Sequence, residues 1–334
     1  MTRNSENIAQ LIERLAFQIN ATTFIEPRYK KYGVIFFQNG KRLFFKNKQL
    51  NINISSTVSV TKNKFETNCF LSHFGYCVPK GKTFSKYNYD IKRNRGVDDG
   101  LKFANEIGFP VILKPNDKSQ GVLVCKVNNE KEYYRIARKI LRKKEDILLV
   151  EKFYENYADY RIVVLGDNII SAYQRIPLAI VGNGYSTILE LLEEKRKEFE
   201  QIGRSVKEIN INDFRIKVNL INKKKTFKYI PLMNEKIILL DNSNLSSGGT
   251  TLELTDKVAE EIKRLAISIT KDMNLYLCGI DILTPDITKW TDDYIILEIN
   301  SAPGLDNYAY IGKKQKDYVD NLYLKVLNFV EKYL

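Results

Sequence analysis

Histidine is nearly absent from this 334-residue chain, and its scarcity narrows the chemistry that the chain can perform. The single histidine, His73, lies in an apolar stretch that we expect to be helical, where a structural role is the simpler interpretation. Serine-histidine-aspartate hydrolysis and histidine-ligated zinc are therefore not expected. Carboxylates, lysine, arginine, backbone amides and a hard cation are left to carry any reaction.

Paired cysteines and long apolar runs are also missing. The four cysteines show no metal-ligand spacing, and the first residues lack the apolar core of a signal peptide. No apolar run approaches the roughly 18 to 20 residues needed to span a bilayer. We therefore expect a cytoplasmic protein without a membrane partner.

Positive charge is in excess, with a formal net charge of +13. Basic residues are scattered, and their local clusters are Lys92 to Arg95, Arg138 to Lys144, Lys223 to Lys225 and Lys313 to Lys316. We interpret most of these basic clusters as solvent-exposed helix faces and loops. The alternative interpretation is that they create a positive electrostatic field that attracts anions, whether nucleotide, nucleic acid or acidic substrate.

The N-terminal region is predicted to be a small α/β segment. Residues 6–19 repeat apolar positions at helical spacing behind Ser5 as a cap. Two apolar runs around Asn39-Gly40 indicate a β-hairpin, and residues 64–74 predict a helix that ends at Gly75.

The next segment reads as helix, strand, loop, strand, helix and strand. Asp98 or Asp99 is expected to cap the first helix, and Gly108 to end it. Asn128 is expected to cap the second helix. The predicted elements are a helix to residue 107, strands at 110–115 and 122–127, a polar loop at 116–121, a helix at 130–143 and a strand at 146–151. This order predicts a small α+β lobe.

The C-terminal half is predicted to hold a second hairpin and three helices. The hairpin pairs residues 159–165 with 169–175, and the turn at 182–187 caps a helix at 188–200. Residues 203–236 show only weak periodicity. Thr255 is expected to cap a helix reaching Lys271, and residues 317–333 form a terminal helix.

Three oxygen-bearing side chains stand on two short apolar runs near the end of the chain. Asp281 lies in Cys278 to Leu283, and Glu298 and Asn300 close the run from Tyr294. If the two strands are neighbours, these side chains converge on one point. An all-oxygen set of this kind suits Mg²⁺ that bridges phosphate oxygens.

Groups suited to a nucleotide precede that set. Lys114 closes a strand, and the amides of residues 118–121, which include Lys118, Ser119 and Gly121, could hold phosphates. The segment Leu148 to Glu151 could offer strand-end backbone groups to an adenine edge, with Asp159 accepting from a ribose hydroxyl.

Over roughly residues 62 to 334 the chain resembles the ATP-grasp superfamily of carboxylate-amine ligases. Within it, the chain most resembles the ATP-grasp domain of cyanophycin synthetase and of the bifunctional glutathione synthetases. The segments that carry the likeness are Val150-Glu-Lys152-Phe with Asp159-Tyr-Arg161, Val181 to Ile188, Asn244 to Thr250 followed by Thr255-Asp256, and Glu298 to Leu305.

The resemblance implies an α+β ATP-grasp fold with two lobes clasping Mg·ATP, divided at residues 1–80, 81–151 and 152–334. It assigns Lys64 and Lys114 to the phosphates, and Glu151, Lys152 and Asp159 to the nucleotide. It gives Asp281, Glu298 and Asn300 to magnesium, as two ions bridged by Glu298 or with Mn²⁺ as a substitute. Arg161 and Arg175 would join Lys114 in catalysis, and the substrate would be lined by Asn244, Ser247, Gly248 and Gly249.

The implied reaction is amide-bond formation through an acyl phosphate, with release of ADP and phosphate. Two features depart from the family: the phosphate loop has a single glycine, Gly121, and Leu305 to Tyr308 replace the usual sequence after Gly304. The expected partners are amino acids or peptides, including acidic ones, with a homodimer left open and nucleic acid not expected. The alternatives are an ATP-binding pseudoenzyme, a small-molecule kinase and a basic RNA-binding protein.

Overall fold

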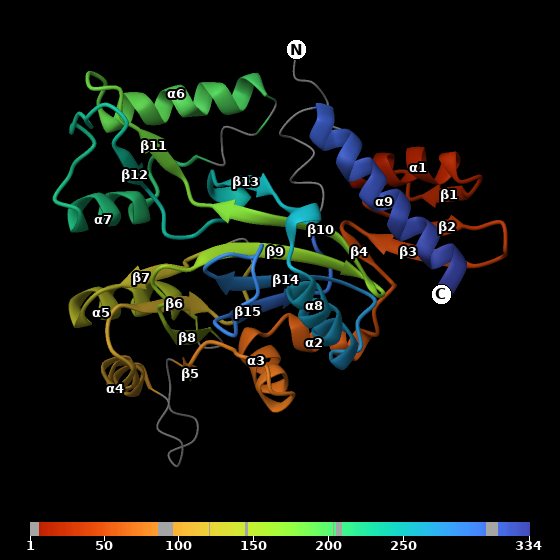
Figure 1. The fold of residues 1–334 in the computed structure, drawn as a ribbon, viewed down its shortest axis with the longest axis horizontal. Coiled ribbons are helices and arrows are strands. Elements are labelled where there is room, and N and C mark those ends of the chain that lie inside the picture. The colour runs from red at the N-terminus through yellow and green to blue at the C-terminus, as the bar shows by residue number, and fades with distance from the viewer. Residues whose placement is uncertain are drawn as a thin grey trace.

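The computed structural model describes residues 7–85, 96–119, 121–143, 146–202, 204, 209–304 and 313–334, and for residues 313–315 only the backbone. In this part of the chain no helix is long and apolar enough to cross a membrane. The Lys92 to Arg95 cluster and the departure at Leu305 to Tyr308 lie outside the described residues. The prediction that Ser5 caps the first helix was wrong, because the helix begins at Ile8 with Asn7 as its N-cap. Figure 1 shows a central sheet with a lid-like layer at lower left and the N-terminal segment at right.

The N-terminal segment packs a helix against a four-stranded antiparallel sheet of order β1-β2-β3-β4. The side chain of Asn7 caps the helix α1. Strands β2 and β3 form the predicted hairpin, and Gly40 lies in its turn with φ +82°. Apolar side chains on one face of the sheet pack against α1 and the C-terminal helix α9. The elements are α1 (Ile8–Gln18), β1 (Thr22–Ile25), β2 (Tyr32–Phe36), β3 (Arg42–Lys46), β4 (Gln49–Leu50) and α9 (Lys313–Tyr333).

Two short helices connect this segment to the next. The side chain of Asn63 caps α3, and the helix ends before Gly75 at φ +89°, as predicted. The N-terminus of α3 therefore carries Lys64, which is buried. The two helices are α2 (Ser55–Thr61) and α3 (Lys64–His73).

The segment predicted as the lid lobe, called the lid below, contains an antiparallel sheet of order β5-β8-β6-β7 with two helices on one face. Both predicted caps were one to three residues out: Gly96 is the first N-cap, with Asp99 accepting from its amide, and Asn129 is the second. The return strand is shorter than predicted, because Gly121 to Leu123 form a turn. The elements are β5 (Gly81–Ser85), α4 (Val97–Ile107), β6 (Val111–Pro115), β7 (Cys125–Val127), α5 (Glu130–Ile140) and β8 (Ile147–Lys152).

The central sheet has the order β13-β10-β9-β14-β15 and is antiparallel throughout. Helix α8 covers one face. The other face carries apolar residues toward α1 and α9 at one end and charged residues at the other. The elements are β9 (Ala158–Leu165), β10 (Asn168–Ile176), β13 (Thr250–Glu253), α8 (Glu260–Asp272), β14 (Leu277–Thr284) and β15 (Ile295–Asn300).

A small helical subdomain branches off between β10 and β13. Thr187 caps its first helix as predicted, whereas the helix α7 was not predicted. Thr255 does not cap α8, whose N-cap is Ala259; its hydroxyl accepts instead from the amide of Ala172. The elements of the subdomain are β11 (Ala179–Val181), α6 (Ile188–Gln201), α7 (Phe214–Asn222), β12 (Lys236–Ile238) and the 3₁₀ helix at Leu245–Ser247; a second 3₁₀ helix, Thr255–Lys257, follows β13.

The predicted α+β class is therefore confirmed. The division at residues 1–80, 81–151 and 152–334 stays a prediction, although β8 ends one residue past the second of these boundaries.

Candidate active site

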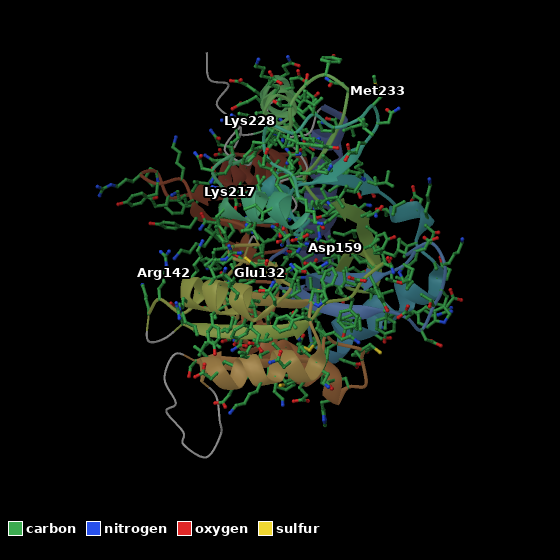
Figure 2. The ribbon with its side chains drawn as sticks, turned by 90° about the vertical axis from the view of Figure 1, so that its left-hand side faces the viewer. Glu132, Arg142, Asp159, Lys217, Lys228 and Met233 are labelled. Carbon is green, nitrogen blue, oxygen red and sulfur yellow. The ribbon has the colours of Figure 1, made fainter. Side chains whose placement is uncertain are left out.

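Charged side chains from four neighbouring strands meet on the open end of the central sheet. Arg161 lies opposite Asp281, which lies opposite Glu298, and Arg175 lies opposite Asp159. Cross-strand partners in antiparallel strands point to the same side of the sheet. The sheet register therefore brings together residues that are more than one hundred positions apart in the chain. In Figure 2 the label of Asp159 lies near the middle of the molecule, at a height between those of Glu132 in α5 and Lys217 in α7.

Asp281 is the centre of this cluster and is almost fully buried. Arg161 donates to it through Nε at 2.6 Å and Nη2 at 2.8 Å, and Arg175 Nη1 lies 2.9 Å from its Oδ2. Arg175 also reaches Asp159 Oδ1 through Nη2 at 2.6 Å. Burial alone would lower the pKa of Arg175, but Asp159 and Asp281 outweigh burial and raise it. Both arginines are therefore fixed in the charged state.

Glu298 is held more loosely than Asp281. Its Oε2 lies 3.7 Å from Lys64 Nζ, its Oε1 lies 3.8 Å from Arg161 Nη2, and Asn300 donates to Oε1 at 3.1 Å. Burial opposes ionisation, but the neighbouring Lys64 and Arg161 lower the pKa of Glu298 below its usual value. An ionised, partly exposed carboxylate thus lies beside an amide at the end of β15.

Asp281, Glu298 and Asn300 lie on the paired strands β14 and β15, with Asp281 opposite Glu298 and Asn300 bonded to Glu298, and their role as metal ligands stays a prediction that the donor atoms fit. Among the described residues, however, no group of three or more histidine, cysteine, aspartate or glutamate side chains lies close enough to hold a metal ion. Both oxygens of Asp281 are already hydrogen-bonded to arginine. Glu298 and Asn300 therefore fit Mg²⁺ better than Asp281 does, and phosphate oxygens would have to complete the coordination.

The lid contributes a buried ion pair. Lys114 Nζ lies 2.6 Å from Glu151 Oε2, and Oε1 of Glu151 is buried without a hydrogen-bond partner. Lys114 and Glu151 share the sheet face that α4 and α5 leave open, because these helices pack on the alternate residues. The orphaned Glu151 oxygen indicates that a donor from a ligand or water belongs there.

One predicted nucleotide contact needs correction. Strand β8 is paired on both sides, with β5 and with β6, so the backbone of Leu148 to Glu151 is already used in the sheet. An adenine edge would have to meet the chain after Glu151. Lys152, the last residue of β8, is exposed at that point, and its amide bonds to the carbonyl of Lys80.

Lys64 links the helix α3 to the phosphate loop. Its Nζ donates to the carbonyl of Lys118 at 2.6 Å and lies near Glu298. Burial is the main reason that the pKa of Lys64 lies below its usual value, and Glu298 partly opposes this effect. Lys118 and Ser119 have exposed side chains, and the carbonyl of Lys118 is the contact between this loop and Lys64.

The predicted phosphate loop, residues 117–121, also contacts the predicted substrate loop, residues 244–250. Gly121 has φ +68°, and a Cβ atom there would lie 2.3 Å from Asn244 Oδ1 and 2.4 Å from Asn242 Nδ2. Arg215 of α7 donates to the carbonyl of Gly121 at 2.8 Å. A side chain at position 121 would therefore separate the two loops, which explains a glycine at this position.

The substrate loop is itself tightly built. Gly248 has φ +84°, and a Cβ atom on Gly249 would lie 2.7 Å from the carbonyl oxygen of Ser243. Asn242 donates to Asn244 at 3.2 Å and to Ser247 at 3.3 Å. Arg204 is buried and donates to the carbonyls of Gly249 and Leu245. Asn244, Ser247, Gly248 and Gly249 thus form one ordered turn beside the lid.

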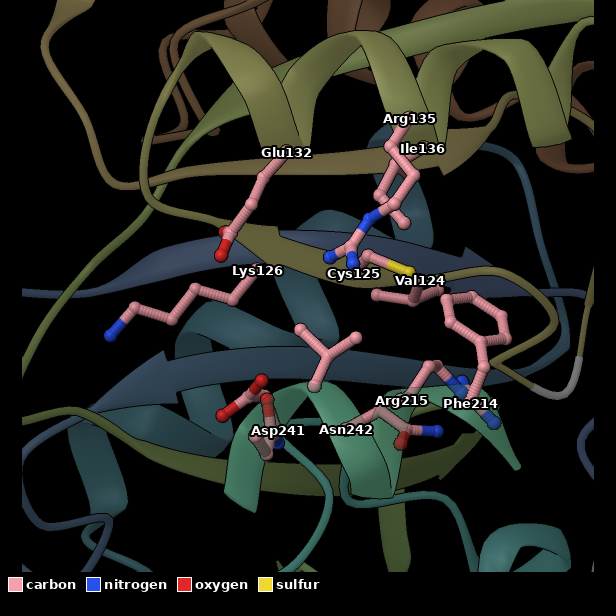
Figure 3. A pocket seen from close by; sticks show the side chains of 12 residues that line it. Val124, Cys125, Lys126, Glu132, Arg135, Ile136, Phe214, Arg215, Asp241 and Asn242 are labelled. Carbon is pink, nitrogen blue, oxygen red and sulfur yellow. The ribbon is translucent and has the colours of Figure 1, made fainter. Parts of the chain in front are cut away.

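A shallow pocket adjoins this contact, at the outer edge of the lid. Figure 3 shows side chains of β7 and α5 facing those of α7, with Asp241 and Asn242 at the base. Cys125 lies among them, and burial raises its pKa to about 12. The pocket is a continuation of the space between the lid and the subdomain, apart from the Asp281 cluster.

Sequence reasoning missed Arg204, Arg215 and Asn242, which hold the two loops together. Arg204 and Arg215 fall in or beside the Lys- and Asn-rich segment 203–236, whose weak periodicity gave no element to place them on. Asn242 stands two residues before Asn244, and this Asn-x-Asn spacing at a glycine turn was the available signal.

With this geometry established, the similarity to known proteins becomes informative. A sequence profile described as the RimK-like ATP-grasp domain matches residues 87–180 and 241–318, more than half of the chain. The chain belongs to the RimK-like ATP-grasp family. The two matched segments contain the charged face of the central sheet, most of the lid lobe and the substrate loop, and they omit the helical subdomain between them.

Named relatives agree with the resemblance inferred from the sequence. The glutathione biosynthesis bifunctional protein GshAB of Clostridium perfringens is 29% identical over 270 residues, which cover 78% of this chain and 33% of that protein. Cyanophycin synthetase of Geminocystis herdmanii is 29% identical over 256 residues, which cover 74% of this chain and 28% of that protein. The chain thus spans about a third of the length of these relatives.

A solved structure confirms the predicted fold. The bifunctional glutathione synthetase from Pasteurella multocida superposes with a TM-score of 0.56 at 21% sequence identity, covering 95% of this chain and 43% of that one. The predicted ATP-grasp fold is therefore confirmed, and the added subdomain is part of the matched length.

Proposed function

We propose that this chain is an ATP-dependent carboxylate-amine ligase that joins amino acids or peptides. The observation that carries the proposal is the charged cluster of Lys64, Arg161, Arg175, Asp281 and Glu298 at the end of the central sheet. The open face of the lid sheet adds Lys114 and Glu151. The family membership and the ligase names of the relatives support the same reaction class.

The residues divide into three tasks. Lys64, Lys114 and the backbone of Lys118 to Gly121 would bind the phosphates of ATP, and Glu151, Lys152 and Asp159 the nucleoside. Arg161 and Arg175 are held beside Asp281 by hydrogen bonds. They would orient the substrate carboxylate and neutralise the negative charge on the phosphoryl group during its transfer. The turn from Asn244 to Gly249 would position the acyl or amine substrate.

The reaction needs no nucleophile from the protein. A carboxylate oxygen of the substrate attacks the γ-phosphorus, the bond to the β-phosphate oxygen breaks, and ADP leaves. An amine nitrogen then attacks the acyl carbon of the acyl phosphate, loses a proton, and inorganic phosphate leaves. Positioning and charge neutralisation account for such catalysis, which agrees with the near absence of histidine.

Glu298 and Asn300, with Asp281 behind them, would hold magnesium. Bound Mg²⁺ would supply charge neutralisation for the phosphate oxygens. We further propose two ions bridged by Glu298, with Mn²⁺ as a functional substitute, and a homodimer as the assembly. The chain's own contribution is to keep Glu298 ionised through Lys64 and Arg161.

ADP release with pooled amino acids and short peptides tests the proposal. We expect at least one pool to stimulate ADP release, with phosphate freed in equal amount and an amide product detected by mass spectrometry. Phosphate retained on the product would instead identify a small-molecule kinase. Binding of Mg·ATP with no turnover in any pool would identify an ATP-binding pseudoenzyme and would end the ligase proposal.

A further inference from the structure

The outer face of the N-terminal sheet is an exposed surface that the ligase reaction does not use. Alternate residues of β1, β2 and β3 pack inward against α1 and α9. The residues between them point to the outer face. On this face Phe24 of β1, Val34 of β2 and Phe44 of β3 form one cross-strand row. The next cross-strand row is Thr22, Phe36 and Arg42, and Tyr32 pairs with Lys46 in a third.

Aromatic rings dominate this outer face and are open to solvent. Phe24 is 58% exposed, Phe44 55%, Tyr32 42% and Phe36 38%. Val34, which lies between Phe24 and Phe44, is only 8% exposed, so the two rings cover it and leave their other faces free. Because neighbouring strands lie about 4.8 Å apart, Phe24 and Phe44 stand roughly 10 Å apart as separate platforms.

Positive charge is concentrated in the same segment of the chain, and Arg42 and Lys46 stand in the cross-strand rows of the outer face. Between Asn20 and Leu50 the chain has one acidic residue, Glu26, against seven basic residues, Arg28, Lys30, Lys31, Lys41, Arg42, Lys46 and Lys48. This segment therefore supplies a net +6 of the chain's +13. Arg42 lies over the Phe36 ring at 5.7 Å and Arg28 over the Tyr29 ring at 5.2 Å.

We propose that this aromatic and basic face binds single-stranded nucleic acid. Bases stack on exposed aromatic rings irrespective of sequence, and flanking lysine and arginine neutralise phosphates. A second copy of the chain would bring two faces of the same sign together, which is repulsive. A membrane is disfavoured because the exposed phenylalanines lie on the strands, while the loops at the two ends of the sheet, residues 26–31 and 37–41, carry mostly charged and amide side chains with Tyr29 as their one exposed ring.

The direct test is fluorescence anisotropy with a labelled oligouridylate of 12 nucleotides, over a range of salt concentrations. We expect binding that weakens with salt. The double variant Phe24→Leu/Phe44→Leu keeps Val34 covered and removes both rings, and it should weaken binding at least about tenfold. The double variant Arg42→Gln/Lys46→Gln should flatten the slope of log affinity against log salt by about 1.4.

The controls separate this face from the rest of the molecule. Trp290→Ala removes another exposed aromatic ring, in the loop before β15, and should leave binding unchanged. ADP release should be the same in all these variants, so failure here is distinguishable from failure of the ligase proposal. Circular dichroism and thermal unfolding of each variant check that the sheet is intact.

Five outcomes would overturn the proposal. Four are no binding at low salt, binding that is unchanged in Phe24→Leu/Phe44→Leu, equal competition by polyglutamate or polyphosphate, and preferential sedimentation with phosphatidylserine vesicles. The fifth is a dimer in light scattering that dissociates in Phe24→Leu/Phe44→Leu, which would assign the face to self-association.

Discussion

Replacing Glu298 by glutamine should separate catalysis from stability at the candidate site. Glu298 is partly open, with 28% of its side chain exposed, and its two cationic partners stand 3.7 and 3.8 Å away. Asp281, on the paired position of β14, has only 2% exposed and receives three bonds of 2.6 to 2.9 Å from two arginines. The same loss of one charge should therefore have different consequences at the two positions.

The magnitudes follow from those contacts. Pairs that are partly exposed and near 4 Å contribute about 1 kcal/mol each at most, so Glu298→Gln should lower the free energy of unfolding by about 1 to 2 kcal/mol. Asp281→Asn leaves two buried arginines with a neutral partner, and loss of one member of a buried pair costs about 3 to 5 kcal/mol. Turnover, in contrast, should fall at least about a thousandfold in Glu298→Gln, because a ligand to the phosphate-bound cation is lost.

Urea unfolding of both variants, ADP release and titration with a non-hydrolysable ATP analogue plus Mg²⁺ would measure these effects. Glu298→Gln should weaken binding of the Mg²⁺-analogue complex and have little effect on binding without Mg²⁺. Turnover within fivefold of the unmodified chain would refute the metal assignment. A loss of stability equal to that of Asp281→Asn would show that Glu298 is structural.

Three further outcomes are expected. Arg175→Ala should lower the free energy of unfolding by about 3 to 5 kcal/mol, because Asp159 and Asp281 lose a buried partner. The same variant should reduce ligation more than nucleotide binding. As a control, Arg14→Ala breaks the more exposed pair with Asp320 and should lower the free energy of unfolding by no more than about 1 kcal/mol in the same urea titration. Gly121→Ala should raise the KM for ATP, because its Cβ would meet Asn242 and Asn244, whereas Gly40→Ala, which also has positive φ but meets nothing within 4 Å, should leave the KM unchanged. Only the exposed Cys69 and Cys77 should react with Ellman's reagent in the native chain up to about pH 9, because burial raises the pKa of Cys125 and of Cys278 to about 12; reaction of all four before unfolding would contradict the buried environment.

Local patterns predicted most elements because each depends on a few adjacent residues. The Asn39-Gly40 hairpin, the Thr187 cap and the glycine that ends α3 were all read correctly from short stretches. The caps of α4 and α5 were misplaced because several acceptors stand side by side, and Asp98, Asp99, Asn128 and Asn129 are equally plausible from sequence. Helix α7 was missed because its apolar positions Ile216 and Leu220 stand among lysines and asparagines.

The sequence named residues that the structure brings close together, but it did not predict their connections, and their roles stay predictions. Alternation along β14 and β15 predicted that Asp281 and Glu298 would lie together if the two strands were neighbours, which they are. It could not reveal that Arg161 and Arg175 both close on Asp281, because that contact depends on the order of β10, β9 and β14 in the sheet. Nor could it show that β8 lies inside the lid sheet, which removed the proposed adenine contact.

The distribution of charge bears on what the site can bind. Lys64, Lys114, Arg161 and Arg175 are matched by Glu151, Asp159, Asp281 and Glu298, so the candidate site is balanced, while a large share of the excess lies on the N-terminal sheet. The net charge of the chain is therefore no argument for an acidic acceptor at the active site. A balanced cluster has no net positive charge with which to neutralise the phosphates of a nucleoside triphosphate, so cations have to enter with it. The structure thus favours binding of ATP as its magnesium complex, with Glu298 exposed where that cation would arrive.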